Sequence, residues 1–372
     1  MEEYTLNLLE NLFESDQKNE YILFLNSWRK GKTDFFWLEK YPNVKIKKFN
    51  FPNKLLNFLF WYFNWPKIDQ MIGGADVFFM PNIIFGGVGK ESKLVVTIHD
   101  LSFERYPETF SLKRRLWHSF INPRKICARA DKIIAVSEST RNDLVDLYKI
   151  NPKKIKTIYS GVSEKFCPIS RNDEKLISIK EKYKLPYKFI LYLGTIEPRK
   201  NISGIVRAYE QLRKTAAENE ELKELLDYKF VIAGSAGWLS GKIFSEIEKS
   251  EFRDHIKTIN FVDDTDKEYV FNLASLFIYP SFFEGFGFPI LEAMSSGVPV
   301  IASNNSSLPE IIGNSGILID PDKSQEICDA MREILTNSEL RAKLVERGLV
   351  RSKDFNWRKT AKLTLKILTG SK

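Results

Sequence analysis

Two glutamates eight positions apart, Glu284 and Glu292, flank a turn that contains two glycines in the carboxyl-terminal half of the sequence. The apolar run at 274–279 before the turn is typical of a buried strand, and Pro289 suits the first turn of a following helix. Open α/β sheets bind ligands beyond the carboxyl ends of their strands, where helix starts present N–H groups. We therefore expect both carboxylates to face a binding cleft. The alternative is a tight glycine turn with two solvated glutamates.

Two adjacent cations, Arg199 and Lys200, lie between a strand predicted at 189–194 and a helix predicted from Ile202. A departing diphosphate develops negative charge, which cations and oriented N–H groups can stabilise without a metal. We expect these two side chains to have that role. The alternative is an exposed basic loop.

One histidine, His99, directly follows the strand predicted at 93–98. A side chain at the carboxyl end of a strand is placed for ligand contact rather than for packing, so we predict a functional role for it. His118 and His255 lie in polar helical or loop contexts, and we assign them none. No histidine lies at metal-ligand spacing from another histidine or from a cysteine, so the sequence predicts no metal site.

The elements that position these residues form two alternating β/α units, because 372 residues exceed what one hydrophobic core holds. An amphipathic helix, rather than a strand, is predicted at the start of the chain, and 160–168 resembles a linker. Further strands are expected at 20–25, 44–49, 75–80, 131–136, 156–159, 229–233, 258–262, 298–302 and 316–319. Further helices are expected at 111–129, after Ser137, and at 264–273, 324–336, 338–353 and 355–368.

The net charge of +8 lies mostly in the first half of the chain. Residues 1–165 contain 26 Lys+Arg against 19 Asp+Glu, whereas 166–372 contain 30 against 29. A basic face attracts anionic lipid, phosphorylated ligands or nucleic acid. No nucleic-acid-binding motif accompanies it, so we expect no nucleic-acid partner. The alternative is a solvated positive surface without a partner.

The most apolar stretch, 55–65, includes Trp61, Tyr62, Phe63 and Trp65. Eleven residues are too few to span a bilayer, which needs about 20. Rings on every side of a helix favour peripheral contact with a membrane surface, although burial in the domain core is equally open. No signal peptide is evident, and three widely separated cysteines indicate a reducing compartment. We therefore expect a cytoplasmic protein, at the inner face of the cell membrane.

The segment from Glu284 to Glu292, together with Gly297-Val-Pro-Val-Ile-Ala-Ser, resembles the E-x(7)-E signature of family 4 retaining glycosyltransferases with the GT-B fold. Three further segments also resemble parts of that family. Residues 193–201 resemble its phosphate-contacting loop, 96–103 its histidine loop, and 130–139 its last acceptor-domain strand. The resemblance covers nearly the whole chain. Within the family, the loop at 193–201 resembles those of mannosyltransferases of surface-polysaccharide assembly.

The resemblance implies an α/β fold of two Rossmann-like domains that face each other across a cleft. The acceptor-side domain would comprise 1–163 plus about 355–372, with the last helix crossing back, and 164–354 would bind the nucleotide sugar. Two features depart from the family: the usual first strand with its glycine-rich loop is missing, and Thr195 replaces a frequent arginine.

Residue roles also follow from the resemblance. Glu292 would bind the ribose, Glu284 the transferred sugar, and Arg199 and Lys200 the diphosphate, while His99 would lie beside the sugar. Backbone contacts to sugar and phosphate would come from Gly285, Phe286, Gly287, Phe288, Pro289 and Ile290, and the base would lie near Gly234 and Val262.

The resulting hypothesis is retaining transfer of a hexose from a nucleotide sugar to a saccharide or lipid-linked saccharide, without a metal or other cofactor. Mannose from GDP-mannose is favoured over a UDP-sugar. One alternative is a weakly active or inactive partner subunit, because the family's first strand is missing. Another is a nucleotide-sugar epimerase with the same fold.

Overall fold

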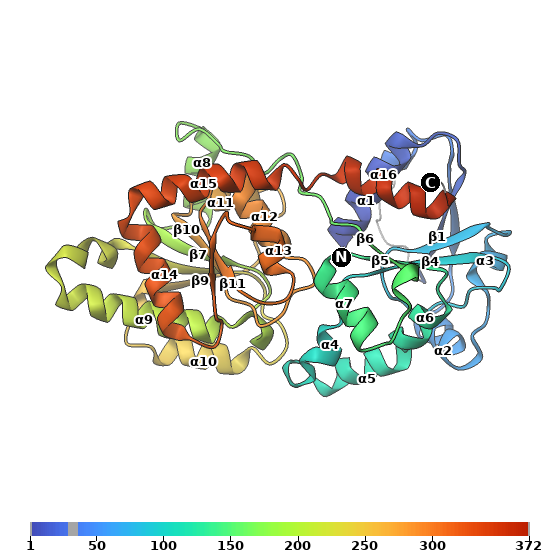
Figure 1. The fold of residues 1–372 in the computed structure, drawn as a ribbon, viewed down its shortest axis with the longest axis horizontal. Coiled ribbons are helices and arrows are strands. Elements are labelled where there is room, and N and C mark those ends of the chain that lie inside the picture. The colour runs from blue at the N-terminus through green and yellow to red at the C-terminus, as the bar shows by residue number, and fades with distance from the viewer. Residues whose placement is uncertain (1, 29–35, 371–372) are drawn as a thin grey trace. The chain divides into compact units, whose positions relative to one another are not determined.

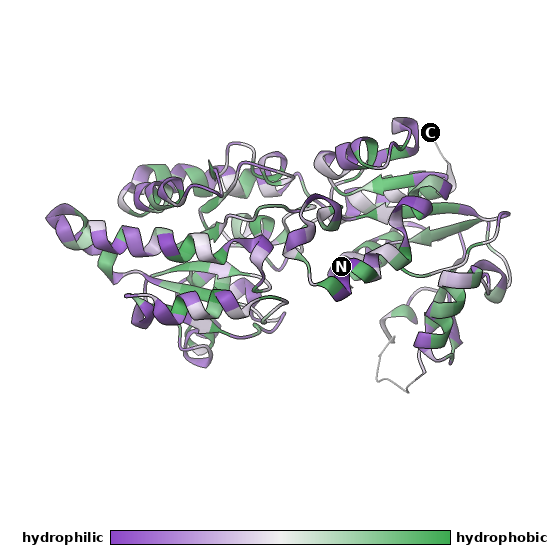
Figure 2. Cartoon of the chain, turned by 90° about the horizontal axis from the view of Figure 1, so that it is seen from below, coloured by the Kyte–Doolittle hydropathy of each residue, from purple (hydrophilic) through white to green (hydrophobic). Residues whose placement is uncertain are grey.

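The computed structural model describes residues 2–28 and 36–370, which form two compact α/β units (Figure 1). The first unit contains the chain through Leu101, then Lys113–Gly161, and the segment from Asn356 onward. The second contains Ser102–Leu112 and Val162–Phe355. The strands of both units are coloured mainly hydrophobic, whereas the helices mix both colours (Figure 2). Each unit is therefore built on mainly apolar strands that amphipathic helices cover.

The first unit begins with a helix, as the sequence predicts, and contains two parallel sheets. A two-stranded sheet pairs β1 (Tyr21–Asn26) with β2 (Val44–Phe49). A four-stranded sheet has the order β3-β4-β5-β6, from β3 (Val77–Met80), β4 (Lys93–Ile98), β5 (Lys132–Ala135) and β6 (Ile155–Thr157). The helices of this unit are α1 (Glu2–Ser15), α2 (Asn53–Phe63), α3 (Ile68–Met71), α5 (Leu112–Ile121), α6 (Pro123–Arg129), α7 (Glu138–Asp146) and α16 (Trp357–Thr369).

The second unit is built on one six-stranded parallel sheet with the order β12-β11-β10-β7-β8-β9. Its strands are β7 (Phe189–Leu193), β8 (Lys229–Ala233), β9 (Ile256–Ile259), β10 (Leu276–Tyr279), β11 (Val300–Ser303) and β12 (Ile317–Ile319). Its helices are α4 (Ser102–Arg105), α8 (Glu174–Lys182), α9 (Ile202–Glu218), α10 (Gly241–Lys249), α11 (Lys267–Leu273), α12 (Phe288–Ser295), α13 (Leu308–Ile312), α14 (Ser324–Thr336) and α15 (Ser338–Ser352). Helix α9 packs with α10 and α14, and α8, α11, α12 and α15 form a second helical layer (Figure 1).

Two predicted elements are wrong in detail. The single helix expected at 111–129 is broken into α5 and α6, because Asn122 adopts a left-handed conformation (φ +53°) and Pro123 starts the second helix. The strand expected at 258–262 lies earlier, at Ile256–Ile259, so Val262 falls in the loop beyond it.

The segment Ser102–Leu112 packs with the second unit, although it falls within 1–163, the range expected for the first domain. Trp238 is the reason: its indole N–H donates to the carbonyl of Thr109 at 2.6 Å, and its ring stacks on Phe110 with centroids 5.5 Å apart. The ring of Tyr106 also lies 5.8 Å from that of Phe283. Such aromatic contacts are made in three dimensions, so the sequence order does not reveal them.

Among the described residues, no helix combines the length and the apolar character needed to cross a bilayer. Phe60 is the one ring of α2 that is buried, together with Leu56, and the other rings of 55–65 are not core residues. The alternative of burial in the domain core is therefore wrong for Trp61, Tyr62 and Phe63.

Candidate active site

The strand order of the second unit places a topological switch point between β7 and β10. From β7 the chain continues outward to β8 and β9, then returns to β10 on the other side and continues to β11 and β12. Loops that leave the carboxyl ends of β7 and β10 diverge at such a point, and ligands bind there in open α/β sheets. These two loops carry Arg199 and Lys200 after β7, and Glu284 after β10.

The structure brings three predicted side chains together at this point. The Lys200 ammonium lies 2.5 Å from Glu284 Oε1, and the Arg199 guanidinium lies 3.3 Å from the same oxygen. Arg199 also bonds Glu197 Oε1 at 2.8 Å and the carbonyl of Phe283. We call Glu197, Arg199, Lys200 and Glu284 the charge cluster. It is not the exposed basic loop that the sequence left open, because Lys200 and Glu284 are each only 7% exposed.

A tyrosine lies beneath the cluster. Lys200 Nζ donates to the Tyr279 hydroxyl at 2.6 Å, and the Tyr279 ring stacks on that of Tyr192 with centroids 6.0 Å apart. Burying charge is costly unless it is paired and hydrogen-bonded. The tyrosine hydroxyl and the carboxylate together give Lys200 the partners that this burial requires.

Burial and charge pairing shift the pKa values of Glu284 and Glu197 in opposite directions. Burial alone would raise the pKa of Glu284, but Lys200 and Arg199 outweigh it, and the pKa falls below its ordinary value. Burial raises the pKa of Glu197 despite the opposing charges of Arg199 and Lys200. Burial lowers the pKa of Lys200, an effect that Glu284 opposes. Glu284 is thus held as a carboxylate, whereas Glu197 is the easier of the two to protonate.

Serine side chains position the turn after Glu284. Ser307 Oγ donates to the carbonyls of Glu284 and Phe286, both at 2.9 Å, and Ser306 Oγ accepts from the Glu284 N–H at 3.0 Å. Gly287 precedes α12 with φ +107°, a conformation that favours glycine, and Pro289 lies in the first turn of α12 as predicted. The remaining predicted backbone positions, Gly285, Phe286, Phe288 and Ile290, belong to this turn and the helix start.

The predicted ribose and base residues lie along the same edge of the sheet. Glu292 is on α12 and 4% exposed, so neither glutamate is the solvated residue of the alternative interpretation. Gly234 follows β8 with φ +147°, and a Cβ there would lie 1.9 Å from the carbonyl oxygen of Gly194. Val262 follows β9 and is buried. All three follow the carboxyl end of a strand, on α12 and in the loops after β8 and β9.

His99 belongs to the first unit, at the end of β4. Its Nε2 lies 2.9 Å from the carbonyl oxygen of Pro81, and the ring meets that of Tyr4 edge-on at 4.6 Å. Because a carbonyl only accepts, Nε2 carries the proton and Nδ1 is left as an acceptor. Burial lowers the pKa of His99, so the imidazole is neutral near pH 7.

Sequence reasoning missed Glu197, Tyr279, Ser306 and Ser307 as members of this site. Glu197 could have been found, because it lies two residues before Arg199 in the same loop. Tyr279 ends an apolar strand, where a tyrosine is usual, and the serines lie in a polar run without a distinguishing pattern. Their roles depend on strands that are adjacent only in the folded sheet.

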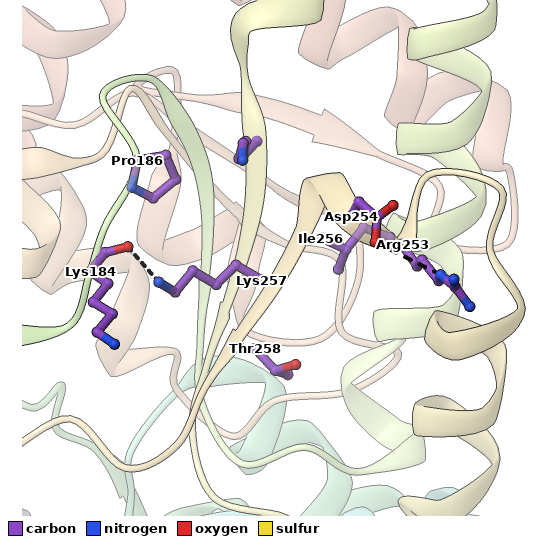
Figure 3. Close-up of a pocket in the computed structure, with 8 residues that line it drawn as sticks. Lys184, Pro186, Arg253, Asp254, Ile256, Lys257 and Thr258 are labelled. Atoms are coloured by element: carbon purple, nitrogen blue, oxygen red, sulfur yellow. Dashed lines mark hydrogen bonds and ion pairs between the residues drawn. The ribbon is translucent and has the colours of Figure 1, made fainter.

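A hollow lies at the opposite, amino-terminal edge of the same sheet. It has a volume of about 470 Å³, and its lining includes the basic residues Lys184, Lys229 and Lys257 and the acidic residue Asp254. Figure 3 shows Lys257 directed at the backbone carbonyl of Lys184, to which it donates. None of the predicted site residues lines it, so it is separate from the charge cluster.

Comparison with known proteins finds families and relatives for most of the chain. Residues 1–166 match the family described as "Glycosyltransferase Family 4", and residues 173–351 match "Glycosyl transferases group 1". The chain is 32% identical over 266 residues to "O-antigen chain mannosyltransferase B" of Escherichia coli, which covers 71% of this chain and 67% of that protein. It is 33% identical over 284 residues to "Serotype-specific mannosyltransferase WbdA" of Escherichia coli, covering 75% of this chain and 34% of that protein. The chain therefore spans about a third of the length of this second relative.

Among solved structures, a sucrose-phosphate synthase from Thermosynechococcus elongatus superposes with a TM-score of 0.77 at 20% identity. The match covers 99% of this chain and 93% of that one. At this identity the likeness shows the fold and carries no statement about substrate.

Proposed function

Because the chain belongs to glycosyltransferase family 4 and has the GT-B fold, we propose that it transfers mannose, with retention of configuration, from GDP-mannose to a saccharide or lipid-linked saccharide. The observation that carries the proposal is the buried charge cluster at the switch point, in which Arg199 and Lys200 each lie within 3.3 Å of the same oxygen of Glu284. The names of the two mannosyltransferase relatives support mannose over other hexoses. The reaction would take place on the cytoplasmic side of the cell membrane.

Each residue of the site has a role in this proposal. Arg199 and Lys200 stabilise the charge that develops on the leaving diphosphate, and Glu284 orients them and contacts the transferred sugar. Glu292 accepts hydrogen bonds from the ribose hydroxyls. His99 presents a neutral imidazole to the sugar, since burial lowers its pKa. No metal or other cofactor takes part, because the two cations supply the positive charge.

A donor panel tests the proposal. We expect release of nucleoside diphosphate from GDP-mannose in the presence of a mannose-terminated acceptor, and little from UDP-glucose, UDP-N-acetylglucosamine or ADP-glucose. The product should carry an α-linked mannose, as judged from the one-bond C1–H1 coupling of the new residue in its NMR spectrum. We expect Glu284→Ala and Lys200→Ala to lose at least a hundredfold in rate, which corresponds to about 2.7 kcal/mol of transition-state stabilisation.

Lys214→Ala is the matched control, because Lys214 pairs with Glu251 at 3.0 Å on the surface. Full activity in both cluster variants, or no turnover of any donor, would contradict the proposal. Binding of GDP without turnover would instead favour the partner subunit. Conversion of a nucleotide sugar without transfer to an acceptor would favour the epimerase.

A further inference from the structure

Helix α2 presents aromatic rings to solvent along most of its length. Phe58, Trp61, Tyr62 and Phe63 are 46 to 67% exposed, and Trp65 just beyond the helix is 60% exposed. Leu56 and Phe60 are the buried residues of this helix. Each large aromatic side chain has 150–250 Å² of surface, so half-exposure of these five leaves a patch of several hundred Å². Patches of this size on a protein surface usually mark an interaction site.

Helix α5 extends the same surface. The Phe120 ring lies 4.9 Å from that of Trp61, and the Trp117 ring lies 6.2 Å from that of Phe85, which packs on the core residues of α2. Leu116, Trp117 and Phe120 are 45 to 49% exposed. Only Ile121 of the ten residues in α5 is buried. Helices of this length are marginal on their own in water, so α5 would gain stability from a partner.

The segments that contain these two helices carry a concentrated positive charge. Residues 51–68 and 109–130 contain no aspartate or glutamate and eight basic residues. Lys54, Lys113, Arg114 and Arg115 lie on α2 and α5, and Lys67, Arg124, Lys125 and Arg129 lie just beyond them. Their charge of +8 equals the net charge of the whole chain. Lys113 and Arg115 are exposed on α5, the helix that also carries Trp117 and Phe120.

We propose that α2 and α5 together form a docking face for an anionic lipid bilayer, which we call the aromatic–basic face. Tryptophan and tyrosine favour the membrane–water interface, and lysine and arginine are attracted to anionic headgroups. Both helices are too short to span a bilayer, so they lie in the plane of its surface. A second copy of the chain is a poorer occupant, because pairing would bring two faces of the same charge together.

The aromatic–basic face would bring the protein to the membrane surface at which a lipid-linked acceptor is presented. Only this biological role of the face rests on the proposed function. The docking itself requires no donor or acceptor. Vesicle binding can therefore be measured separately from glycosyl transfer, and a failure of one does not imply a failure of the other.

Vesicle flotation tests the proposal with the full chain. We expect the protein to float with phosphatidylcholine vesicles that contain phosphatidylglycerol, and high salt to weaken binding because it screens the charges. Lys113→Glu/Arg115→Glu should reduce partitioning at least tenfold, since each basic residue near an anionic surface contributes a several-fold gain. Tyr62→Ser/Phe63→Ser should also reduce it at least tenfold, because both rings leave the interface.

Two matched variants control for charge and for ring loss. Lys242→Glu/Lys249→Glu makes the same charge change on exposed residues of α10, and Tyr187→Ser removes a ring that is 91% exposed in the second unit. Both should float like the parent chain. Thermal melts of all variants identify any that fail to fold, and the charge-reversal pair tests the proposal on surface residues that no core packing depends on.

Three results would overturn the proposal. The parent chain could fail to bind anionic vesicles, or the face variants could bind as well as the controls. Sedimentation could also show a dimer of the parent chain that the face variants dissociate, in which case the face would belong to a second copy.

Discussion

At the scale of single residues, the Lys200–Glu284 pair combines a structural and a functional requirement. Both side chains are buried and share one short contact, and each is the other's main charge partner. Removing one member of a buried pair leaves the other charge uncompensated, which costs far more than breaking a surface pair. Arg199 remains near Glu284 Oε1 at 3.3 Å and limits that cost.

Lys200→Met is expected to lower the free energy of unfolding by about 3 kcal/mol, the low end for a broken buried pair. Urea denaturation monitored by circular dichroism measures the change. Lys214→Met breaks a Lys–Glu pair of 3.0 Å whose side chains are 53% and 69% exposed, and should cost less than about 1 kcal/mol. Equal losses in the two variants would contradict the burial of the charge cluster.

Replacing the two cluster glutamates by glutamine should change the pH dependence of stability in opposite senses. The folded pKa of Glu284 is lowered, so its ionisation adds stability that is present above about pH 4.5 and lost as the pH falls through the folded pKa. The folded pKa of Glu197 is raised, so its protonation contributes stability to the folded state. This contribution is fully present below about pH 4.5 and is lost as the pH rises through the folded pKa.

We therefore expect Glu284→Gln to be more destabilising at pH 6 than at pH 3.5, and Glu197→Gln to become relatively more stable than the parent as the pH rises from 4.5. Urea titrations across this pH range measure both differences. The same sign of pH dependence in the two variants would show that the two carboxylates share one environment.

The residue types of the site could be predicted from the sequence, but their pairing could not. Glu284, Arg199 and Lys200 stand out because each follows an apolar strand. The 2.5 Å contact between Lys200 and Glu284 depends on the adjacency of β7 and β10, whereas the 2.8 Å contact between Arg199 and Glu197 lies within one loop. Any bound diphosphate would have to share these cations with the two glutamates, a condition that the spacing of the motifs does not reveal.

At the scale of elements, strands with continuous apolar runs were predictable, and boundaries set by single backbone conformations were not. Strands β4 and β8 lie where the sequence places them, because both are apolar runs bounded by polar residues or glycine. The break between α5 and α6 depends on the left-handed conformation of Asn122. The spacing of apolar residues in this segment does not predict that conformation. The displaced β9 depends on its parallel pairing with β8, from Phe230↔Ile256 to Ala233↔Ile259.

Gly234→Ala tests the close approach between the ends of β7 and β8. The new Cβ would lie 1.9 Å from the carbonyl oxygen of Gly194 at φ +147°, so the loops must move apart. We expect a loss of about 2 kcal/mol or more in stability and weaker binding of GDP, measured by denaturation and calorimetry. Gly241→Ala, which meets no atom within 4 Å at the start of α10, should be neutral or slightly stabilising. Equal behaviour of the two variants would remove the steric argument.

At the scale of the whole molecule, the chain leaves the first unit at Gly161 and returns to it at Asn356. The two crossing segments touch: a Cβ on Gly161 would lie 2.3 Å from the Trp357 nitrogen, and the Val162 N–H donates to the Phe355 carbonyl at 3.1 Å. Helix α16 then packs on α1, where Trp357 meets Tyr4 with ring centroids 5.6 Å apart. The amphipathic pattern of α16 predicts a helix but not its unit, because an apolar stripe does not specify which surface it covers.

Trp357→Ala should therefore destabilise the first unit even though the residue follows the whole second unit in sequence. Trp357 is 6% exposed, and its truncation should cost about 3–5 kcal/mol. Hydrogen exchange followed by mass spectrometry should show lost protection in α1 and in β3 to β6, with β7 to β12 unchanged. Leu344→Ala, at a 4% exposed position of α15, should lower protection in β7 to β12 and leave α1 and β3 to β6 unchanged, because α15 packs on α12 in the second unit. Loss of protection in both units from either substitution would mean that the two units unfold as one cooperative block, and the assignment of α16 would then have no separate effect on stability.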